Sequence, residues 1–117
     1  MKVLKCDRSR LIAAAMEKIP CDLTVKNIRL VNMFTGEIYP AEVDILDGAV
    51  VRVREEGESA PKAAEIYDGG GRFLIPGYID THVHIESSMM IPENFGRAVV
   101  TWGTTTVCTD PHEIANV

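Results

Sequence analysis

The chain has 117 residues, of which 46% are hydrophobic, and its formal net charge is −5 at pH 7. This length and apolar content suffice for one packed domain, and the acidic balance argues against a nucleic-acid partner. No apolar run reaches membrane-spanning length and the N-terminus lacks the layout of a secretory signal, so we expect no membrane partner.

The first part of the chain predicts one helix followed by a small β-domain. Residues 7–19 have helical apolar spacing, with Asp7 or Ser9 as the cap, and we expect this helix to carry no chemistry. The strand-like runs that follow are at 23–25, 28–31, 43–46 and 50–53, and Asp47-Gly48 predicts a two-residue hairpin between the last two. We expect a small antiparallel sheet that contains no histidine and no clustered acid pair suggestive of catalysis.

The pattern changes at the glycine run 69–71, which is the expected internal boundary. Beyond it, residues 78–86 have the pattern of a strand, Pro92 suits the first turn of a helix, and residues 104–109 are β-branched. A strand, a helix and a second strand make a βαβ unit with parallel strands and a right-handed crossover. The predicted organisation is a helix within 1–20, a β-domain over 21–71 and an α/β segment over 72–117.

Two of the three histidines lie two residues apart on the first strand of this unit. Because successive strand side chains point to opposite faces, four polar side chains are expected on one face: Asp80, His82, His84 and Glu86. Two imidazoles at this spacing can hold one divalent metal ion, and nearby carboxylates can complete or orient its ligands. Asp80 lies deeper, so we expect it to support the ligands rather than to bind the metal.

The third histidine follows the second strand. Parallel strands end at the same edge of a sheet, so Asp110, His112 and Glu113 are expected beside the histidine pair. We expect a site role for at least one of His112 and Glu113, and a supporting role for Asp110. The three cysteines form neither a Cys-x-x-Cys pair nor an even set, which favours free thiols in a reducing cytoplasm. Cys108 is expected to be a small buried residue rather than a nucleophile.

Several motifs resemble the amidohydrolase superfamily and, within it, the bacterial adenine deaminases. Pro-Gly-Tyr-Ile-Asp-Thr-His-Val-His at 76–84 is similar to the first barrel strand of these metal-dependent hydrolases. Ile-Glu-Ser-Ser-Met-Met at 85–90, Gly-Thr-Thr-Thr at 103–106 and Asp-Pro-His-Glu-Ile-Ala-Asn-Val at 110–117 narrow the resemblance to the adenine deaminases. The sheet expected over 21–71 resembles the small β-domain beside their barrel.

This resemblance implies an α/β fold: a small β-domain followed by the first βαβ unit of a (β/α)8 barrel. It implies hydrolysis of adenine to hypoxanthine and ammonia, a step of purine salvage, with manganese or iron as the metal and zinc as an alternative. His82 and His84 would bind metal, and the catalytic groups would be Glu86, His112 and Glu113. A barrel needs about 250 residues, so we expect the truncated N-terminal part of a longer cytoplasmic enzyme. We expect this part to be inactive alone and homo-oligomeric.

Other interpretations stay open. The histidines can be ordinary polar residues of a half-exposed strand, Glu86 can end the strand or cap a helix, and His112-Glu113 can begin one. Another amidohydrolase that opens cyclic amides, such as a dihydroorotase or hydantoinase, fits the strand motif equally well, and a non-catalytic assembly module is a third possibility. A deaminase of a different fold is not favoured, because the Pro-Cys-x-x-Cys motif that accompanies His-x-Glu is absent.

Overall fold

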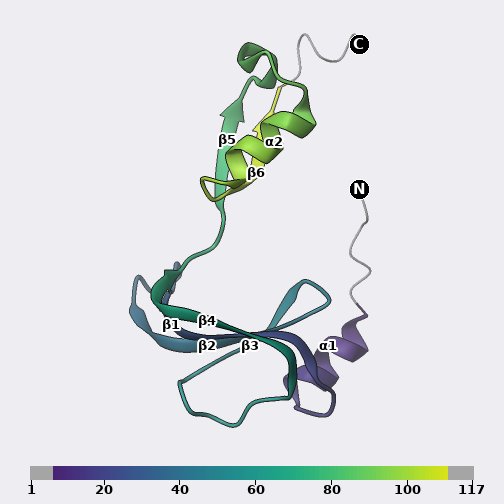
Figure 1. Cartoon of the computed structure of the whole chain (residues 1–117), viewed down its shortest axis with the longest axis vertical. Coiled ribbons are helices and arrows are strands. Elements are labelled where there is room, and N and C mark those ends of the chain that lie inside the picture. Colours follow the sequence, from purple (N-terminus) through teal and green to yellow (C-terminus); the bar gives the residue numbers. More distant parts are fainter. Residues whose placement is uncertain (1–6, 111–117) are drawn as a thin grey trace. The chain divides into compact units, whose positions relative to one another are not determined.

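The computed structural model describes residues 7–110, and the chain divides into two compact units at the bond between Ile75 and Pro76 (Figure 1). The first unit begins with helix α1 (Arg8–Ala15) and continues through strands β1 (Cys21–Val31), β2 (Ile38–Leu46), β3 (Ala49–Arg54) and β4 (Ala63–Leu74). The second contains β5 (Tyr78–Val83), the 3₁₀ turn η1 (Ile85–Ser88), α2 (Pro92–Val100) and β6 (Thr104–Thr109). No helix among the described residues is long and apolar enough to cross a membrane.

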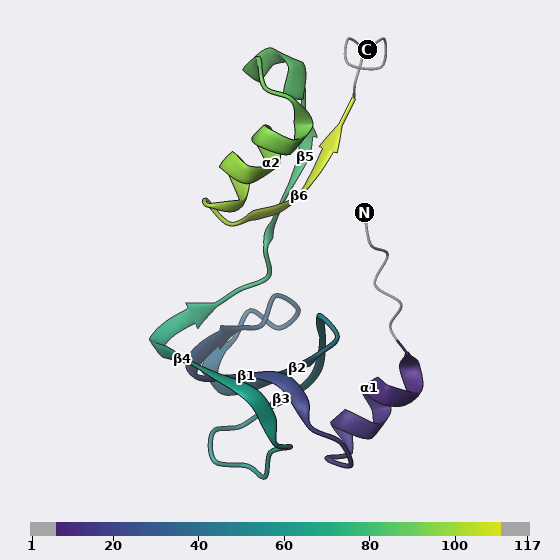
Figure 2. The ribbon, with the colours of Figure 1, turned by 45° about the vertical axis from the view of Figure 1, so that its right-hand side comes forward.

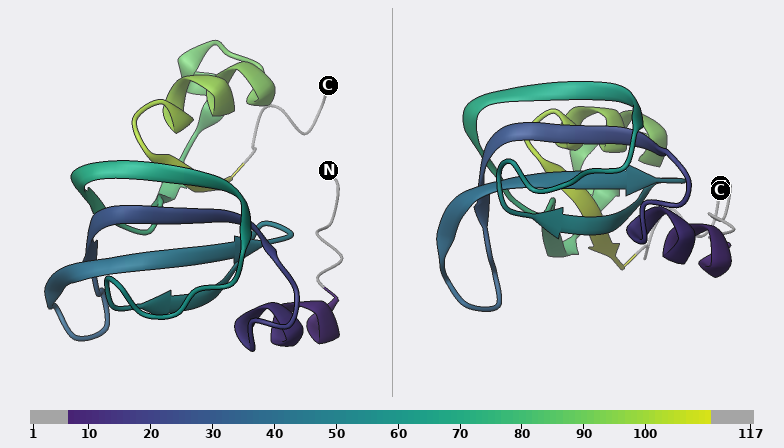
Figure 3. Two further views of the ribbon diagram at one scale, coloured as in Figure 1. Left: turned by 60° about the horizontal axis from the view of Figure 1, so that its bottom comes forward. Right: turned by 90° about the horizontal axis from the view of Figure 1, so that it is seen from below.

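The sheet of the first unit is mixed rather than antiparallel, which corrects the expectation from the sequence. Its strand order is β3-β2-β1-β4, and Figure 3 shows the four strands side by side. The β1–β2 and β2–β3 pairs are antiparallel hairpins, but β4 pairs with β1 in parallel. The eight-residue connection 55–62 carries the chain from the β3 edge to the far edge, where β4 starts level with Cys21 and runs in the same direction as β1. Residues in a turn predict a hairpin because its two strands are neighbours in the sequence. The β1–β4 pair joins strands that are distant in the sequence, so turn residues do not predict it.

Turn chemistry explains the hairpins. Asp47 and Gly48 both have positive φ, at 52° and 75°, which is the backbone that a two-residue hairpin requires, so this prediction is confirmed. At the β1–β2 turn, the side chain of Asn32 accepts hydrogen bonds from the backbone N–H groups of Phe34 and Thr35. The two runs expected at 23–25 and 28–31 form one strand, with a bulge where Asn27 adopts a φ of 51°.

The glycine run 69–71 lies inside β4 and does not interrupt it (Figure 2). A Cβ atom on Gly69 would lie 2.2 Å from the Cγ2 atom of Ile28. Gly70 and Gly71 have φ values of 61° and 74°, and the register of β4 against β1 shifts in this region. The glycines therefore allow the bulged backbone of β4 to lie close to the side chain of Ile28. They do not separate two units.

Two clusters of side chains hold the first unit together. One is built on the β1–β2 pair from Val25, Ile28, Ala41 and Val43. The other joins α1 to the sheet through Ala14, Cys21 and Leu46. The helix is capped by the Asp7 carboxylate, which accepts from the backbone N–H of Ser9, as one of the two expected caps. Leu11 and Ile19 pack against the second cluster, whereas Ile12 and Met16 are exposed.

The second unit is a βαβ unit, as predicted. Strands β5 and β6 are parallel, Pro92 stands in the first turn of α2, and Glu93 and Arg97 form an ion pair one turn apart on its exposed side. A Cβ atom on Gly77 would lie 2.2 Å from Oγ1 of Thr105, so β5 can enter beside β6 only with glycine there. Trp102 lies in the turn after α2 and is exposed.

Candidate metal centre

The histidine pair lies at the carboxyl end of β5. The strand ends at Val83, so His82 is its penultimate residue and His84 follows it directly. The expected strand continued to Glu86, but residues 85–88 form a 3₁₀ turn instead. Ile85, 5% exposed, anchors this turn. The turn reverses the chain and keeps Glu86 beside His84, so the proximity expected from strand alternation arises by another route.

The two imidazoles face each other through equivalent nitrogens. The Nε2 atoms of His82 and His84 are 3.1 Å apart, with the ring planes at 63°. The carboxylate of Asp80 accepts a 3.1 Å hydrogen bond from the backbone N–H of His82, so Asp80 steadies the backbone at the first histidine rather than its ring. The contact between the rings thus brings one nitrogen of each histidine together at the end of the strand.

Glu86 approaches the other side of the second imidazole. Its Oε1 lies 3.4 Å from Nδ1 of His84, and its side chain is only 11% exposed. The turn is held by the Ser88 hydroxyl, which donates to the carbonyl of Ile85 at 2.6 Å, and by the backbone N–H of Met89, which donates to the carbonyl of Glu86. A carboxylate beside Nδ1 favours the proton on that nitrogen and leaves the Nε2 lone pair of His84 directed toward His82.

The nitrogen pair fits two ligands of a divalent metal ion. A tetrahedral ion bound to two imidazoles at about 2.0–2.1 Å holds the nitrogens roughly 3.3 Å apart, close to the 3.1 Å separation here. Neutral imidazole with its second nitrogen beside a carboxylate is the usual metal-binding arrangement. Within residues 7–110, however, no three His, Cys, Asp or Glu side chains come together as a complete metal site. The described residues therefore supply a pair of ligands, not a full set.

The second strand brings one further predicted residue to the same edge. Val83 pairs with Thr109 in the parallel sheet, so the next residues, His84 and Asp110, both follow the carboxyl edge. Asp110 is exposed there. His112 and Glu113 lie outside the described residues. Cys108 is exposed, contrary to expectation, because the two-stranded sheet of the described residues leaves the side of β6 that carries it uncovered.

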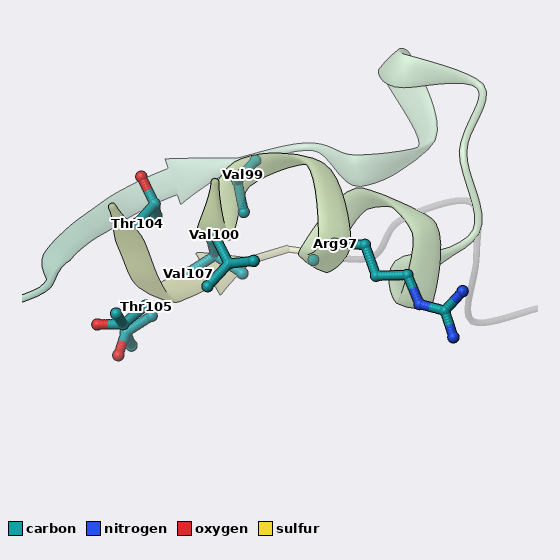
Figure 4. A pocket seen from close by; sticks show the side chains of 8 residues that line it. Arg97, Val99, Val100, Thr104, Thr105 and Val107 are labelled. Carbon is teal, nitrogen blue, oxygen red and sulfur yellow. The ribbon is translucent and has the colours of Figure 1, made fainter. Parts of the chain in front are cut away.

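A separate apolar pocket of about 380 Å³ lies between α2 and β6. Figure 4 shows Val99, Val100 and Val107 gathered there, with Arg97 extending away. None of the lining residues is a histidine or a carboxylate, so this pocket carries no candidate chemistry. It is an apolar packing surface of the βαβ unit.

A buried ionic cluster in the first unit was missed by the sequence interpretation. The guanidinium of Arg54 contacts the carboxylates of Glu42 and Asp44, and the Thr24 hydroxyl donates to Asp44 at 2.7 Å. Burial acts to lower the pKa of Arg54, but the hydrogen bond and charge of Asp44, with the charge of Glu42, outweigh it and raise that pKa. The sheet therefore contains a buried acid pair, but both carboxylates are paired with Arg54, so the pair does not suggest catalysis. Glu42-x-Asp44 on one strand, with an arginine on the next, was the available signal.

Comparison of the sequence with known proteins identifies similar proteins. Residues 73–117 match the model of the amidohydrolase family. The chain is 44% identical over 107 residues to an adenine deaminase of Moorella thermoacetica, and 49% identical over 108 residues to one of Desulfatibacillum aliphaticivorans. The chain is therefore similar to the amidohydrolase family over residues 73–117 and to adenine deaminases along most of its length. Each of these two alignments covers 92% of the chain but only 18% of the relative.

Solved amidohydrolase structures share the fold of this chain. An N-acyl-D-glutamate deacylase from Bordetella bronchiseptica, complexed with zinc and a phosphonate inhibitor, superposes with a TM-score of 0.61 at 24% identity over 75% of the chain. The L-hydantoinase of Arthrobacter aurescens superposes with a TM-score of 0.59 at 28% identity over 74% of the chain. The chain covers 18% and 20% of these two structures, respectively.

Proposed function

We propose that this chain is the N-terminal part of a metal-dependent adenine deaminase, an enzyme that converts adenine and water to hypoxanthine and ammonia. The observation that carries the proposal is identity of 44–49% with adenine deaminases along 92% of the chain. The facing imidazoles at the end of β5 support it, because they present the ligand pair that a metal-dependent hydrolase needs. The 18% coverage of these relatives supports a longer whole protein.

In this proposal, His82 and His84 hold a divalent ion, with manganese, iron and zinc all compatible with imidazole and carboxylate ligands. When bound, such an ion lowers the pKa of a water ligand toward neutrality. Glu86 fixes the tautomer of His84, and Asp80 holds the backbone of His82. The first contact directs the Nε2 lone pair of His84 toward His82, and the second fixes the backbone from which the His82 ring extends.

The remaining predicted side chains are proposed to carry out the proton transfers. Deamination requires a proton to move from the attacking water to the departing nitrogen. We assign this work to the side chains that follow the two strands, namely Glu86, His112 and Glu113, with Asp110 in support. The proposal includes a homo-oligomeric cytoplasmic enzyme that acts on free adenine and has no nucleic-acid or membrane partner.

The test is metal content and adenine turnover by the full-length protein and its His82→Ala and His84→Ala variants. We expect each variant to lose metal and at least 100-fold in turnover while keeping its circular dichroism, because an inner ligand supplies both affinity and geometry. Glu93→Gln, a change at the exposed ion pair of α2, is the control and should leave both quantities unchanged. Full metal occupancy with near-normal turnover in either histidine variant would refute the ligand assignment.

A second candidate is an amidohydrolase that opens cyclic amides. It is favoured by the 28% identity and TM-score of 0.59 with an L-hydantoinase. Turnover of hydantoin, dihydrouracil and adenine by the same preparation separates the two candidates. Hydrolysis of a cyclic amide without deamination of adenine would establish the second candidate in place of the first.

A further inference from the structure

The position of Glu86 beside His84 depends on the backbone of the turn η1. Oε1 of Glu86 lies 3.4 Å from Nδ1 of His84. Its Oε2 is buried, and among the residues that the structure describes no donor forms a hydrogen bond to it. The carboxylate is therefore held in place by the backbone that carries it rather than by a donor to that second oxygen. Whatever fixes this backbone also fixes the contact between Glu86 and the imidazole.

The hydroxyl of Ser88 joins the two ends of this turn. It donates to the carbonyl of Ile85 at 2.6 Å, and it accepts a hydrogen bond from the backbone N–H of Met90 at 3.3 Å. Ile85 is the first residue of η1, and Met90 is the second residue after its end. One side chain thus pairs an acceptor at the start of the turn with a donor beyond its end, and Glu86 lies within the loop that these bonds close.

The backbone of Met89 shows that this turn needs such support. Met89 has a φ of 58° and a ψ of 21°, a left-handed conformation that is unfavourable for a residue with a Cβ atom. Such a conformation persists where surrounding contacts determine it. The side chain of Met89 is 97% exposed, so packing within residues 7–110 does not hold it. The contacts that remain are its own N–H, which donates to the carbonyl of Glu86, and the two hydrogen bonds of the Ser88 hydroxyl.

We propose that Ser88 is a positioning residue of the metal centre, because its hydroxyl holds the turn that keeps Glu86 beside Nδ1 of His84. The inference rests on the proposed function, in which His84 binds the metal through Nε2. A carboxylate beside Nδ1 favours the tautomer whose Nε2 is free to bind, and loss of such a partner weakens metal binding about 10- to 100-fold. Ser88 acts through Glu86 and touches neither the metal nor the substrate in this role.

The test measures the affinity of the metal-free full-length protein for Zn²⁺, by competition with a chelator of known affinity. Ser88→Ala removes the hydroxyl, and we expect it to bind Zn²⁺ about 10-fold more weakly than the wild type. Ser88→Thr keeps a hydroxyl that can bond to the same carbonyl, so its affinity should stay within about threefold of the wild-type value. Circular dichroism of each variant checks that the fold is retained.

Thr101 supplies a matched control in the same βαβ unit. Its hydroxyl donates to the carbonyl of Ala98 at 2.7 Å, which is the same three-residue spacing as in the bond from Ser88 to Ile85. It lies between α2 and the start of β6, whereas the histidine pair lies at the carboxyl end of β5. Thr101→Val removes this bond and keeps the shape of the side chain, and it should leave the Zn²⁺ affinity unchanged.

A double variant separates positioning from a general loosening of the turn. If Ser88 acts through Glu86, then Ser88→Ala should cost no further Zn²⁺ affinity in a Glu86→Ala background, to within about twofold. Additive losses would show that Ser88 acts by another route. Additive losses, an unchanged affinity of Ser88→Ala, an equal loss in Thr101→Val, or a Ser88→Thr variant as weak as Ser88→Ala would each overturn the proposal.

Failure of the proposed function has a different signature, because the readout is metal binding rather than turnover. A wild-type enzyme that binds Zn²⁺ but opens a cyclic amide in place of deaminating adenine would refute the deaminase proposal, and the comparison of the Ser88 variants would still decide the role of Ser88. A wild-type protein that binds no divalent metal would refute the metal centre and, with it, the role of Ser88. Normal Zn²⁺ affinity of Ser88→Ala in an active deaminase would refute the role of Ser88 alone.

Discussion

Arg54 is the cation of a buried ionic cluster in the small β-domain. Its side chain is 1% exposed, and it neutralises Asp44, which is 0% exposed, as well as Glu42. The sequence pattern places these residues on strands but does not show that charge faces inward, because alternation identifies two faces without saying which one is buried. The choice depends on what covers each face, such as the connection after β3, where the Glu58 carbonyl accepts a hydrogen bond from Nη1 of Arg54.

We expect Arg54→Ala to destabilise the first unit by about 3–5 kcal/mol, since it leaves two buried carboxylates without their cation. The measurement is urea denaturation followed by circular dichroism. Arg10→Ala, which breaks an exposed pair with Asp47, is the matched control and should cost about 0–1 kcal/mol. Similar losses of unfolding free energy in the two variants would show that the buried cluster stabilises the unit no more than an exposed ion pair does.

The two described thiols differ in exposure and should differ in reactivity. Burial raises the pKa of the Cys21 thiol, so less of it is thiolate at neutral pH, whereas Cys108 is exposed. In a Cys6→Ser background of the 117-residue chain, we expect Cys108 to react with a maleimide at least 100-fold faster than Cys21. Mass spectrometry of the labelled peptides measures both rates, and denaturant should equalise them. Comparable rates without denaturant would contradict the burial of Cys21.

At the scale of elements, hairpins and the βαβ unit follow from local signals that the structure confirms. Asp47-Gly48 has the backbone its composition predicts, and Pro92 stands where a helix begins. The glycine run 69–71 shows the limit of such signals. Glycine marks a turn, a boundary or a close approach equally well, and only the neighbouring Ile28 identifies it as a close approach.

We expect Gly69→Ala to destabilise the first unit by about 1–3 kcal/mol, because the new methyl group meets Ile28 at 2.2 Å and the backbone carbonyl of Asn27 at 3.0 Å. Gly96→Ala is the matched control in α2, where a Cβ meets nothing within 4 Å. It should stabilise that helix by about 1 kcal/mol. Thermal unfolding of both variants checks the opposite signs, and a neutral Gly69→Ala would show that Ile28 moves aside freely.

At the scale of the whole molecule, the histidine pair was predictable because His82 and His84 lie two residues apart, at the end of one short strand and directly after it. A complete set of metal ligands was not, because no three His, Cys, Asp or Glu side chains come together as a metal site among residues 7–110. Residues that are far apart in the sequence cannot be recognised as partners from their spacing. The apolar pattern of α2 and β6 predicts that their side chains pack into a core. The pattern does not predict that these side chains line an open pocket.

We expect the isolated 117-residue chain to lack adenine deaminase activity and to self-associate at micromolar concentration. An incomplete ligand pair does not activate water. Among residues 7–110, β5 and β6 each leave an open sheet edge, and Ile79 and Val100 are exposed. Hypoxanthine assays and sedimentation velocity give the two readouts. A compact monomer with protected amides over 78–109 would contradict the second expectation, and activity free of contaminating enzyme would contradict the first.

Trp102 gives this molecule an intrinsic optical probe. It is the only tryptophan of the chain and is 84% exposed in the turn between α2 and β6. An indole in water emits at long wavelength, and its emission moves to shorter wavelength when apolar groups cover it. Fluorescence therefore reports, without any label, whether another copy of the chain or the remainder of a longer protein covers this corner. A titration of the chain followed at this one residue would give the concentration at which copies of the chain begin to cover it.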